Sequence, residues 1–235
     1  MPLFIKSGTI KVSFGRLHLH AIRSCSGLIG MYLIFLSLTL LPLSEATVLR
    51  SFSPLFIPVL AFFWLKEKLN FILIPCFIIA IIGTWFLSGL DKPHLTLLSL
   101  LPIAAGIFTA FAMVSIKRMS HLASGIEIVF YFSFFGTIAS LIFLVITKSP
   151  LPNTLSVWGM ILVMGLLATL GQITLTRANS YVSASVLAPF YYLNAVFGAL
   201  LSHFFWNEPL GVYGWIGAAL VIFSGVLLAL TRSKR

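Results

Sequence analysis

The sequence has few charged residues, and very few of them are acidic. Only 9% of its 235 residues are Asp, Glu, Lys or Arg, whereas a soluble domain typically carries about 25%. Hydrophobic residues make up 60%, and the mean hydropathy is +1.09. A water-exposed surface for a chain of this size needs more charge than the sequence contains. The composition therefore excludes a soluble globule and indicates burial in a lipid bilayer.

Cysteine is also scarce, and histidine is scattered. The two cysteines, Cys25 and Cys76, lie within or beside apolar runs and have no paired spacing. His94, His121 and His203 show no metal-ligand spacing, so neither a disulfide framework nor a zinc site is expected. No G-x-S-x-G elbow or P-loop pattern occurs. We therefore expect no enzyme activity, no cofactor and no nucleotide-driven pump.

The apolar residues form eight runs of about 20 residues, which is the length that a helix needs to cross the hydrocarbon core. The runs cover about 25–43, 46–65, 71–90, 95–116, 126–146, 155–176, 182–206 and 210–230. The joints between them are short, so they leave no room for an extramembrane domain. We predict an all-α polytopic membrane protein with about eight transmembrane helices. A basic cytoplasmic segment (1–24) precedes the spans, and a basic cytoplasmic tail (231–235) follows them.

The positive charge is distributed unevenly over the joints. If the N-terminus is inside and the spans alternate, Lys92 and Lys148 fall outside and Arg50 lies within the second span. The other twelve basic residues fall inside: Lys6, Lys11, Arg16, Arg23, Lys66, Lys68, Lys117, Arg118, Arg177, Arg232, Lys234 and Arg235. A bias of this kind sets membrane orientation. We therefore predict that both termini are cytoplasmic, and we interpret the net charge of +10 as loop charge rather than a nucleic-acid-binding surface.

Two stretches of the chain resemble each other. Residues 44–69 and 183–210 each open on a small-residue turn, continue into a span containing proline, and close on a lone glutamate, Glu67 or Glu208. On the predicted topology Glu67 lies inside and Glu208 lies outside, so the two copies have opposite orientations. An inverted repeat of this kind is common in secondary transporters.

The same segments resemble the EamA-type drug/metabolite transporter superfamily. The resemblance covers the chain from about Arg23 onward. It rests on residues 41–46 (Leu-Pro-Leu-Ser-Glu-Ala), 53–56 (Ser-Pro-Leu-Phe) followed by Glu67, Gly171-Gln172 with residues 176–178, and 183–189 with Tyr191-Tyr192 and Glu208.

The resemblance implies a plan of ten helices in two halves of five, in a bacterial inner (plasma) membrane. The chain shows eight spans, and its first span matches the third of the family, so the first two helices are expected to be missing. Residues 25–90 would then form a partial first repeat of three helices, and residues 95–230 a second repeat of five.

Polar residues inside spans are costly in hydrocarbon and usually face the protein interior or a cavity. Gln172, Tyr191, Tyr192 and Asn194 lie deep in their spans, where interhelical hydrogen bonds and substrate contacts are both compatible with them. Arg50 lies about five residues into its span, where it either contacts an anionic group at a cavity mouth or extends to the interface.

In the family, the substrate cavity is built mainly from helices that match the first, second, fourth, sixth and seventh spans. This favours substrate contact for Ser53, Gln172, Tyr192 and Asn194. The predicted substrate site consists of Arg50, Ser53, Gln172, Tyr191, Tyr192 and Asn194. Glu127, at the cytoplasmic edge of the fifth span, is a candidate for proton coupling, with a plain interfacial carboxylate as the alternative.

The leading hypothesis is a secondary transporter that moves a small organic metabolite by alternating access. The first half is most similar to the S-adenosylmethionine uptake subgroup, which implies S-adenosylmethionine or an amino-acid-like substrate. The alternative is a non-transporting truncated remnant, or a structural membrane subunit that needs another chain to complete its bundle. The expected partners are the metabolite and the lipid bilayer, with a homodimer left open and no nucleic acid.

Overall fold

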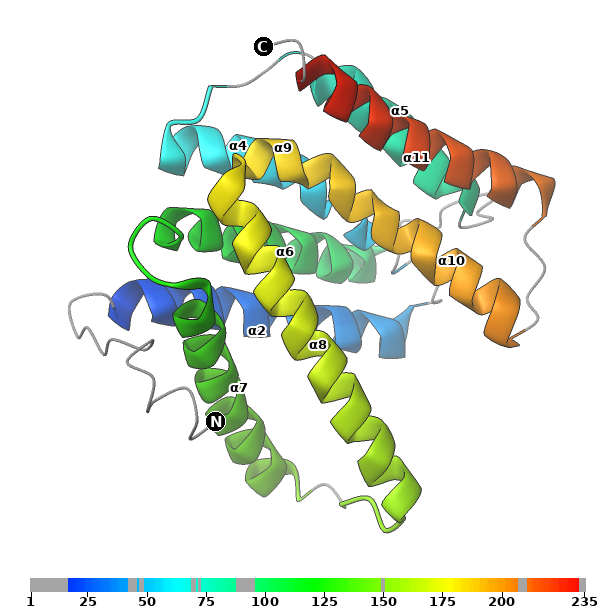
Figure 1. The fold of residues 1–235 in the computed structure, drawn as a ribbon. Coiled ribbons are helices and arrows are strands. Elements are labelled where there is room, and N and C mark those ends of the chain that lie inside the picture. Colours follow the sequence, from blue (N-terminus) through cyan, green and yellow to red (C-terminus); the bar gives the residue numbers. More distant parts are fainter. Residues whose placement is uncertain are drawn as a thin grey trace. The chain divides into compact units, whose positions relative to one another are not determined.

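The computed structural model describes residues 17–41, 46, 49–68, 71, 73–87, 96–148, 151–206 and 211–232. Within these ranges the chain forms α-helices, short 3₁₀ helices and turns, and no strand (Figure 1). The elements in chain order are α2 (Leu17–Leu40), α4 (Ser53–Leu65), α5 (Leu73–Leu87), η2 (Leu97–Ser99), α6 (Leu100–Met119), α7 (Gly125–Thr147), α8 (Leu155–Tyr181), α9 (Ala184–Leu187), η3 (Ala188–Tyr192), α10 (Leu193–Trp206) and α11 (Val212–Arg232).

Each of the eight predicted spans overlaps at least one of these helical elements. Five are long and apolar enough to cross a bilayer: Leu17–Leu40, Leu97–Met119, Gly125–Thr147, Leu155–Tyr181 and Ala184–Phe205. Ser53–Leu65, Leu73–Leu87 and Val212–Leu227 are shorter apolar helices. The prediction of an all-α polytopic membrane protein is therefore confirmed. The first described helix, α2, begins at Leu17 rather than at Cys25, so residues 17–24 belong to the same helix as the predicted first span.

The chain divides into two compact units. Unit 1 comprises Met1–Leu28 and Ser115–Val182, and unit 2 comprises Ile29–Val114 and Ser183–Arg235. Helices α2 and α6 therefore contribute residues to both units. In unit 1, α7 and α8 follow one another as antiparallel neighbours (Figure 1).

The core of unit 2 is built from α4, α5, α6, α9, η3, α10 and α11. Its buried residues are mostly small or aliphatic, among them Ile57, Ala61, Cys76, Ala80 and Val221. The small side chains of this core allow neighbouring helices to approach closely, as is usual where lipid supplies no hydrophobic drive between helices.

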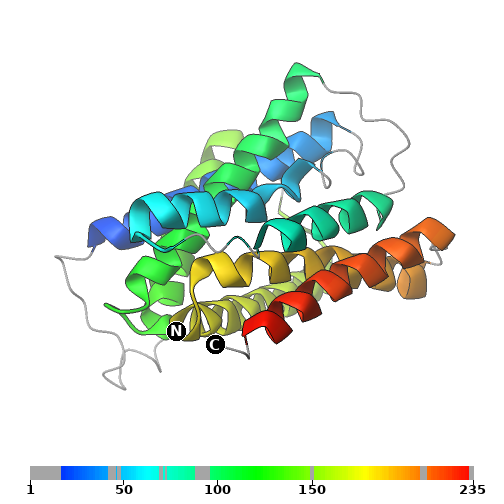
Figure 2. The same cartoon turned by 90° about the horizontal axis from the view of Figure 1, so that it is seen from above.

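Helices α5 and α11 pack closely and lie side by side in both ribbon views (Figures 1 and 2). A Cβ atom built on Gly83 would lie 2.7 Å from the carbonyl oxygen of Gly217, and one built on Gly217 would collide with the carbonyl oxygen of Gly83. The buried Ser224 hydroxyl of α11 also donates a hydrogen bond to the carbonyl oxygen of Cys76 in α5, at 2.7 Å. Because Gly83 and Gly217 have no side chain, the backbones of α5 and α11 can touch at this point.

The seventh span is not one regular helix. It runs through the four-residue α9 and the 3₁₀ segment η3 before α10 begins at Leu193. Pro189 lies in the first turn of η3 and has no N–H to donate, which favours a local change from α to 3₁₀ geometry. Irregular backbone at membrane depth is tolerated where it is buried in protein or lines a cavity.

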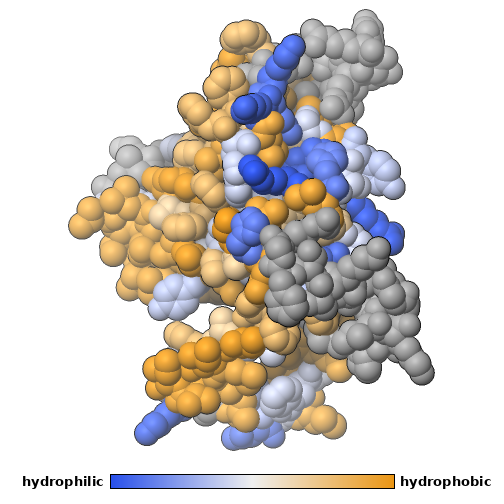
Figure 3. All heavy atoms as spheres, turned by 90° about the vertical axis from the view of Figure 1, so that its left-hand side faces the viewer, coloured by the Kyte–Doolittle hydropathy of each residue, from blue (hydrophilic) through white to orange (hydrophobic). Residues whose placement is uncertain are grey.

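Much of the exposed surface is apolar. On the face drawn in Figure 3, hydrophobic side chains cover most of the described surface and hydrophilic ones gather in smaller patches. Helix α8 is an extreme case, because none of its most apolar 18-residue window is buried, and Met160, Leu162 and Leu166 are among its exposed residues. Contiguous apolar surface of this extent is expected for helices that contact lipid.

The glycine contact between α5 and α11 gives a stability prediction. Gly217→Ala places a methyl group against the α5 backbone, and we expect it to destabilise the protein by about 1–3 kcal/mol, the usual cost of overpacking. Gly159→Ala on α8 is the matched control, because no atom lies within 4 Å of a Cβ built there. Alanine also favours helix by up to about 1 kcal/mol over glycine. Thermal unfolding in detergent tests this, and equal melting temperatures for the two variants would contradict the close contact.

Candidate functional site

Unit 2 contains a small hollow of about 10 Å³ beside the interrupted seventh span, which we call the pocket. Three parts of the chain supply its walls: the residues just before α4, one face of α5, and the end of η3. The lining residues are Ser51, Phe52, Ile81, Thr84, Trp85 and Tyr192. Three of these residues are aromatic, none is charged, and the surface that they expose to the pocket is apolar.

Tyr192 is the most informative of these residues. Its side chain is only 2% exposed, and its ring lies edge-on to Phe77 at 6.5 Å between centroids. Its hydroxyl has no hydrogen-bond partner among the described residues. A buried hydroxyl without a partner costs about 1–3 kcal/mol, so native proteins rarely keep one without a reason. Because Tyr192 also lines the pocket, its hydroxyl is a candidate partner for a molecule bound there.

The other predicted site residues of unit 2 do not line this pocket. Tyr191 is half-buried, and its hydroxyl contacts the Met113 sulfur at 3.3 Å. Ser53 is half-buried at the first position of α4. Arg50 and Asn194 are exposed. Of these predicted residues, Tyr192 lines the pocket and Asn194 is exposed, and their contact with substrate stays a prediction.

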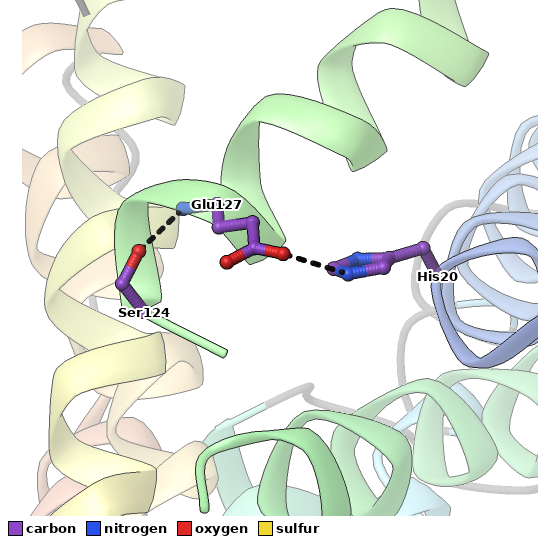
Figure 4. Close-up of polar contacts among 3 residues, drawn as sticks. All are labelled: His20, Ser124 and Glu127. Atoms are coloured by element: carbon purple, nitrogen blue, oxygen red, sulfur yellow. Dashed lines mark hydrogen bonds and ion pairs between the residues drawn. The ribbon is translucent and has the colours of Figure 1, made fainter. Parts of the chain in front are cut away.

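Unit 1 holds the remaining two predicted residues in a buried polar cluster, which also includes His20 and Arg23 of α2. Glu127 lies in the first turn of α7, and its carboxylate points toward the imidazole of His20 (Figure 4). The distance from His20 Nε2 to Glu127 Oε1 is 3.5 Å, and the two side chains are only 2% and 6% exposed. Ser124 caps α7 by accepting a hydrogen bond from the Glu127 backbone N–H. The His20 ring also packs on Tyr131, one turn further along α7, at 4.2 Å between centroids.

Arg23 joins the same cluster from the next turn of α2. It is 3% exposed, donates a hydrogen bond to Gln172 Oε1 at 2.9 Å, and lies over the ring of Phe132 at 4.0 Å. An amide oxygen and an aromatic face both stabilise a guanidinium group that has left water. The sequence analysis counted Arg23 as a loop residue. The structure shows instead that it is buried within a helix.

A third polar contact lies in unit 2, at the start of α9. Lys66 ends α4 in the left-handed conformation (φ 55°), which turns the chain out of the helix before Glu67. The Glu67 carboxylate accepts hydrogen bonds from the backbone N–H groups of Ala184 and Ser185, at 3.1 and 3.2 Å, and from the Ser185 hydroxyl at 2.7 Å. The first backbone N–H groups of a helix have no acceptor within the helix. The Glu67 carboxylate supplies that acceptor for Ala184 and Ser185, and its negative charge is favourable at a helix N-terminus.

Several functional residues were missed by sequence reasoning for identifiable reasons. His20 and Arg23 precede the apolar run, although their spacing of three places them on one face of a helix. Thr84 and Trp85 lie within an apolar run where no pattern distinguishes a pocket lining from a lipid-facing surface. Glu67 was recognised as a repeated feature, but its partner 118 residues away could not be inferred from one sequence.

A bundle of apolar helices that buries ionisable side chains defines an integral, multi-pass membrane protein. The model of the EamA-like transporter family matches residues 2–89 and 96–231, and the chain belongs to that family. The predictions of an EamA-type transporter, and of a protein that is not an enzyme, are therefore confirmed.

Two relatives and one solved structure give the range of this similarity. The chain is 29% identical over 220 residues to the pseudopaline exporter CntI of Pseudomonas aeruginosa, covering 91% of the chain and 75% of the exporter. It is 27% identical over 239 residues to an S-adenosylmethionine uptake transporter of Rickettsia conorii, covering 100% of the chain and 79% of that transporter. A solved crystal structure superposes with a TM-score of 0.83 at 16% identity, covering 98% of the chain and 83% of that structure, which establishes the fold alone.

The Glu67 contact generates the second prediction. Glu67→Gln leaves one acceptor oxygen for three donors, and Ser185→Ala removes one of the donors. We expect each change to destabilise the protein by about 0.5–2 kcal/mol, the usual cost of losing a helix cap. In a double-mutant cycle the two changes should couple by at least about 0.5 kcal/mol, because the residues share a hydrogen bond. Ser180→Ala, at an exposed serine, is the control. Additive effects of Glu67→Gln and Ser185→Ala on the free energy of unfolding in micelles would contradict the contact.

Proposed function

We propose that this chain is a secondary transporter of a small organic metabolite, and that the pocket lined by Tyr192 receives part of the substrate. The buried Tyr192 hydroxyl, without a partner among the described residues, is the observation that carries this proposal. The family and the relatives named above support transport of a small molecule. The interrupted backbone of η3 beside the pocket is typical of transporter substrate sites, where helix breaks at membrane depth line the cavity.

The lining of the pocket favours a particular substrate chemistry. Phe52, Trp85 and Tyr192 offer aromatic faces, against which a flat ring stacks or a cationic group binds. The hydroxyls of Ser51 and Tyr192 add hydrogen-bonding groups. The volume of the pocket, about 10 Å³, is far below that of a typical ligand site, about 300–1,000 Å³, and has room for about one water molecule. A substrate moiety therefore enters only if the lining side chains move apart.

S-adenosylmethionine or an amino-acid-like metabolite is the substrate class we propose. S-adenosylmethionine carries both a flat base and a cationic centre, which suits aromatic walls. The relatives support the general class only, because one is named as an exporter and the other as an uptake transporter, for different compounds.

The membrane arrangement is part of the same proposal. The excess of basic residues in alternate joints supports an inner-membrane location with both termini in the cytoplasm. The division into two inverted repeats at about residues 90–95 remains a prediction, as does a homodimer. Alternating access between the repeats is the mechanism that this arrangement supports.

Uptake of labelled metabolites tests the function. The panel contains S-adenosylmethionine, amino acids and nucleosides, presented to proteoliposomes that contain the purified chain. Tyr192→Phe removes only the hydroxyl, and we expect the apparent affinity for the transported compound to fall about three- to tenfold, as for the loss of one hydrogen bond of about 0.5–1.5 kcal/mol.

Tyr181→Phe is the matched control, because Tyr181 is 85% exposed at the end of α8. Unchanged affinity in Tyr192→Phe would remove that residue from the site. Transport of no panel compound by the wild-type protein would contradict the transporter proposal and favour the structural-subunit alternative.

A further inference from the structure

The polar cluster of unit 1 contains a buried acid–base pair that the substrate pocket does not use. His20 and Glu127 belong to α2 and α7, two helices long enough to span the bilayer. Both side chains are almost fully buried, although each carries a group that water would otherwise solvate. Ionisable groups inside membrane-spanning bundles are costly and are typical of ion and proton pathways.

The geometry allows the pair to hold a proton in two ways. The 3.5 Å separation of Nε2 and Oε1 lets the proton reside on the imidazole, facing a carboxylate, or on the carboxyl group, facing a neutral imidazole. In both forms the pair holds one more proton than it does when the His20 imidazole is neutral and Glu127 is a carboxylate. Binding one proton therefore raises the charge of the pair by one unit, and releasing it restores the original charge.

The surrounding charges are few. On α2, Arg23 supplies a fixed positive charge, held by Gln172 of α8 and the face of Phe132. On α7, Tyr131 packs against the His20 ring and adds a titratable hydroxyl. From α6, Lys117 donates a hydrogen bond to the backbone carbonyl oxygen of Asn179 in α8, at 2.8 Å. Because the Arg23 guanidinium stays protonated, a change of charge in this cluster falls on the His20–Glu127 pair.

A metal ion is a less suitable occupant. No group of three or more His, Cys, Asp or Glu residues that could hold a metal occurs in the described ranges. The nearby guanidinium of Arg23 also opposes a further fixed cation. A proton needs only one acceptor at a time, which this pair provides.

We propose that His20 and Glu127 form the proton-binding site through which transport is coupled to the proton gradient. The inference rests on the proposed function and identifies its coupling ion. The pair takes up one proton when it is accessible from one side of the membrane and releases it to the other, so one positive charge crosses in each cycle. Glu127 was a candidate for this role from sequence, and the structure adds His20 as the second member.

A spectroscopic titration tests the proton site without requiring a substrate. Infrared difference spectra of the purified chain in lipid are recorded as the pH is lowered. We expect carboxyl and imidazole protonation bands that Glu127→Gln and His20→Gln each alter, whereas His18→Gln leaves them unchanged. His18 is the matched control, because it lies on the same helix and is exposed. Identical spectra for the wild type and both pair variants would overturn the proposal.

Transport measurements then test the coupling. In proteoliposomes, a pH difference of about one unit can drive up to about tenfold accumulation or depletion of labelled S-adenosylmethionine, or of the panel compound that is transported, if one proton moves per substrate. We expect Glu127→Gln and His20→Gln to abolish this gradient-driven change while retaining substrate counterflow, which needs no net proton movement. Glu127→Asp, which keeps a carboxyl group, should recover part of it.

The outcomes separate the two proposals. Gradient-driven transport that survives in the pair variants overturns the inference. Loss of counterflow as well, in variants that fold normally, means that the pair is structural and also overturns it. A wild-type protein that transports a panel compound without any response to the pH difference overturns the coupling but leaves the proposed function intact. A wild-type protein that transports nothing overturns both.

Discussion

Hydrocarbon offers no hydrogen bonds, so every polar group that a membrane-spanning helix carries inward has to find its partner within the protein. This constraint accounts for the polar contacts of the chain. Arg23 is held by an amide and an aromatic ring, His20 by Glu127, and the Glu67 carboxylate by the start of a helix. Most of these contacts join residues more than one hundred positions apart in sequence. They therefore select which helices become neighbours, a choice that the apolar surfaces alone leave open.

The two units meet the same constraint differently. In unit 1 the buried charges are matched with charges, amides and rings, which leaves a compact cluster whose protonation state can change. In unit 2 the lining of the pocket carries no charge, and the buried Tyr192 hydroxyl has no partner among the described residues. A titratable pair suits a proton, and an aromatic pocket with hydroxyl groups suits an organic molecule. The proposed function assigns the proton to the pair and part of the substrate to the pocket.

Hydropathy predicted the eight apolar segments because the bilayer imposes one length and one composition on all of them. It could not place the start of α2, since Leu17–Arg23 mixes apolar and basic residues and only burial by other helices reveals its role. It also could not orient the seventh span. Tyr192 and Asn194 are two residues apart, so helical rotation carries them to opposite faces of the span. The backbone also changes from η3 to α10 between them, so no single helical period predicts which of the two faces the protein interior. The sequence therefore indicated the polar residues of this span but not which of them is buried.

The position of Tyr192 depends on contacts some distance from the pocket. The four-residue α9 is too short to be stable alone, and helix nucleation is costly. Glu67 offsets part of that cost by accepting the first N–H groups of α9, and the chain then passes directly through Pro189 into η3, which ends at Tyr192. Because α9 and η3 are continuous, fixing the start of α9 restricts where Tyr192 can lie. The Glu67 carboxylate after α4 thus helps to hold a pocket residue of another span in place, which gives Glu67 a physical role at the proposed substrate pocket.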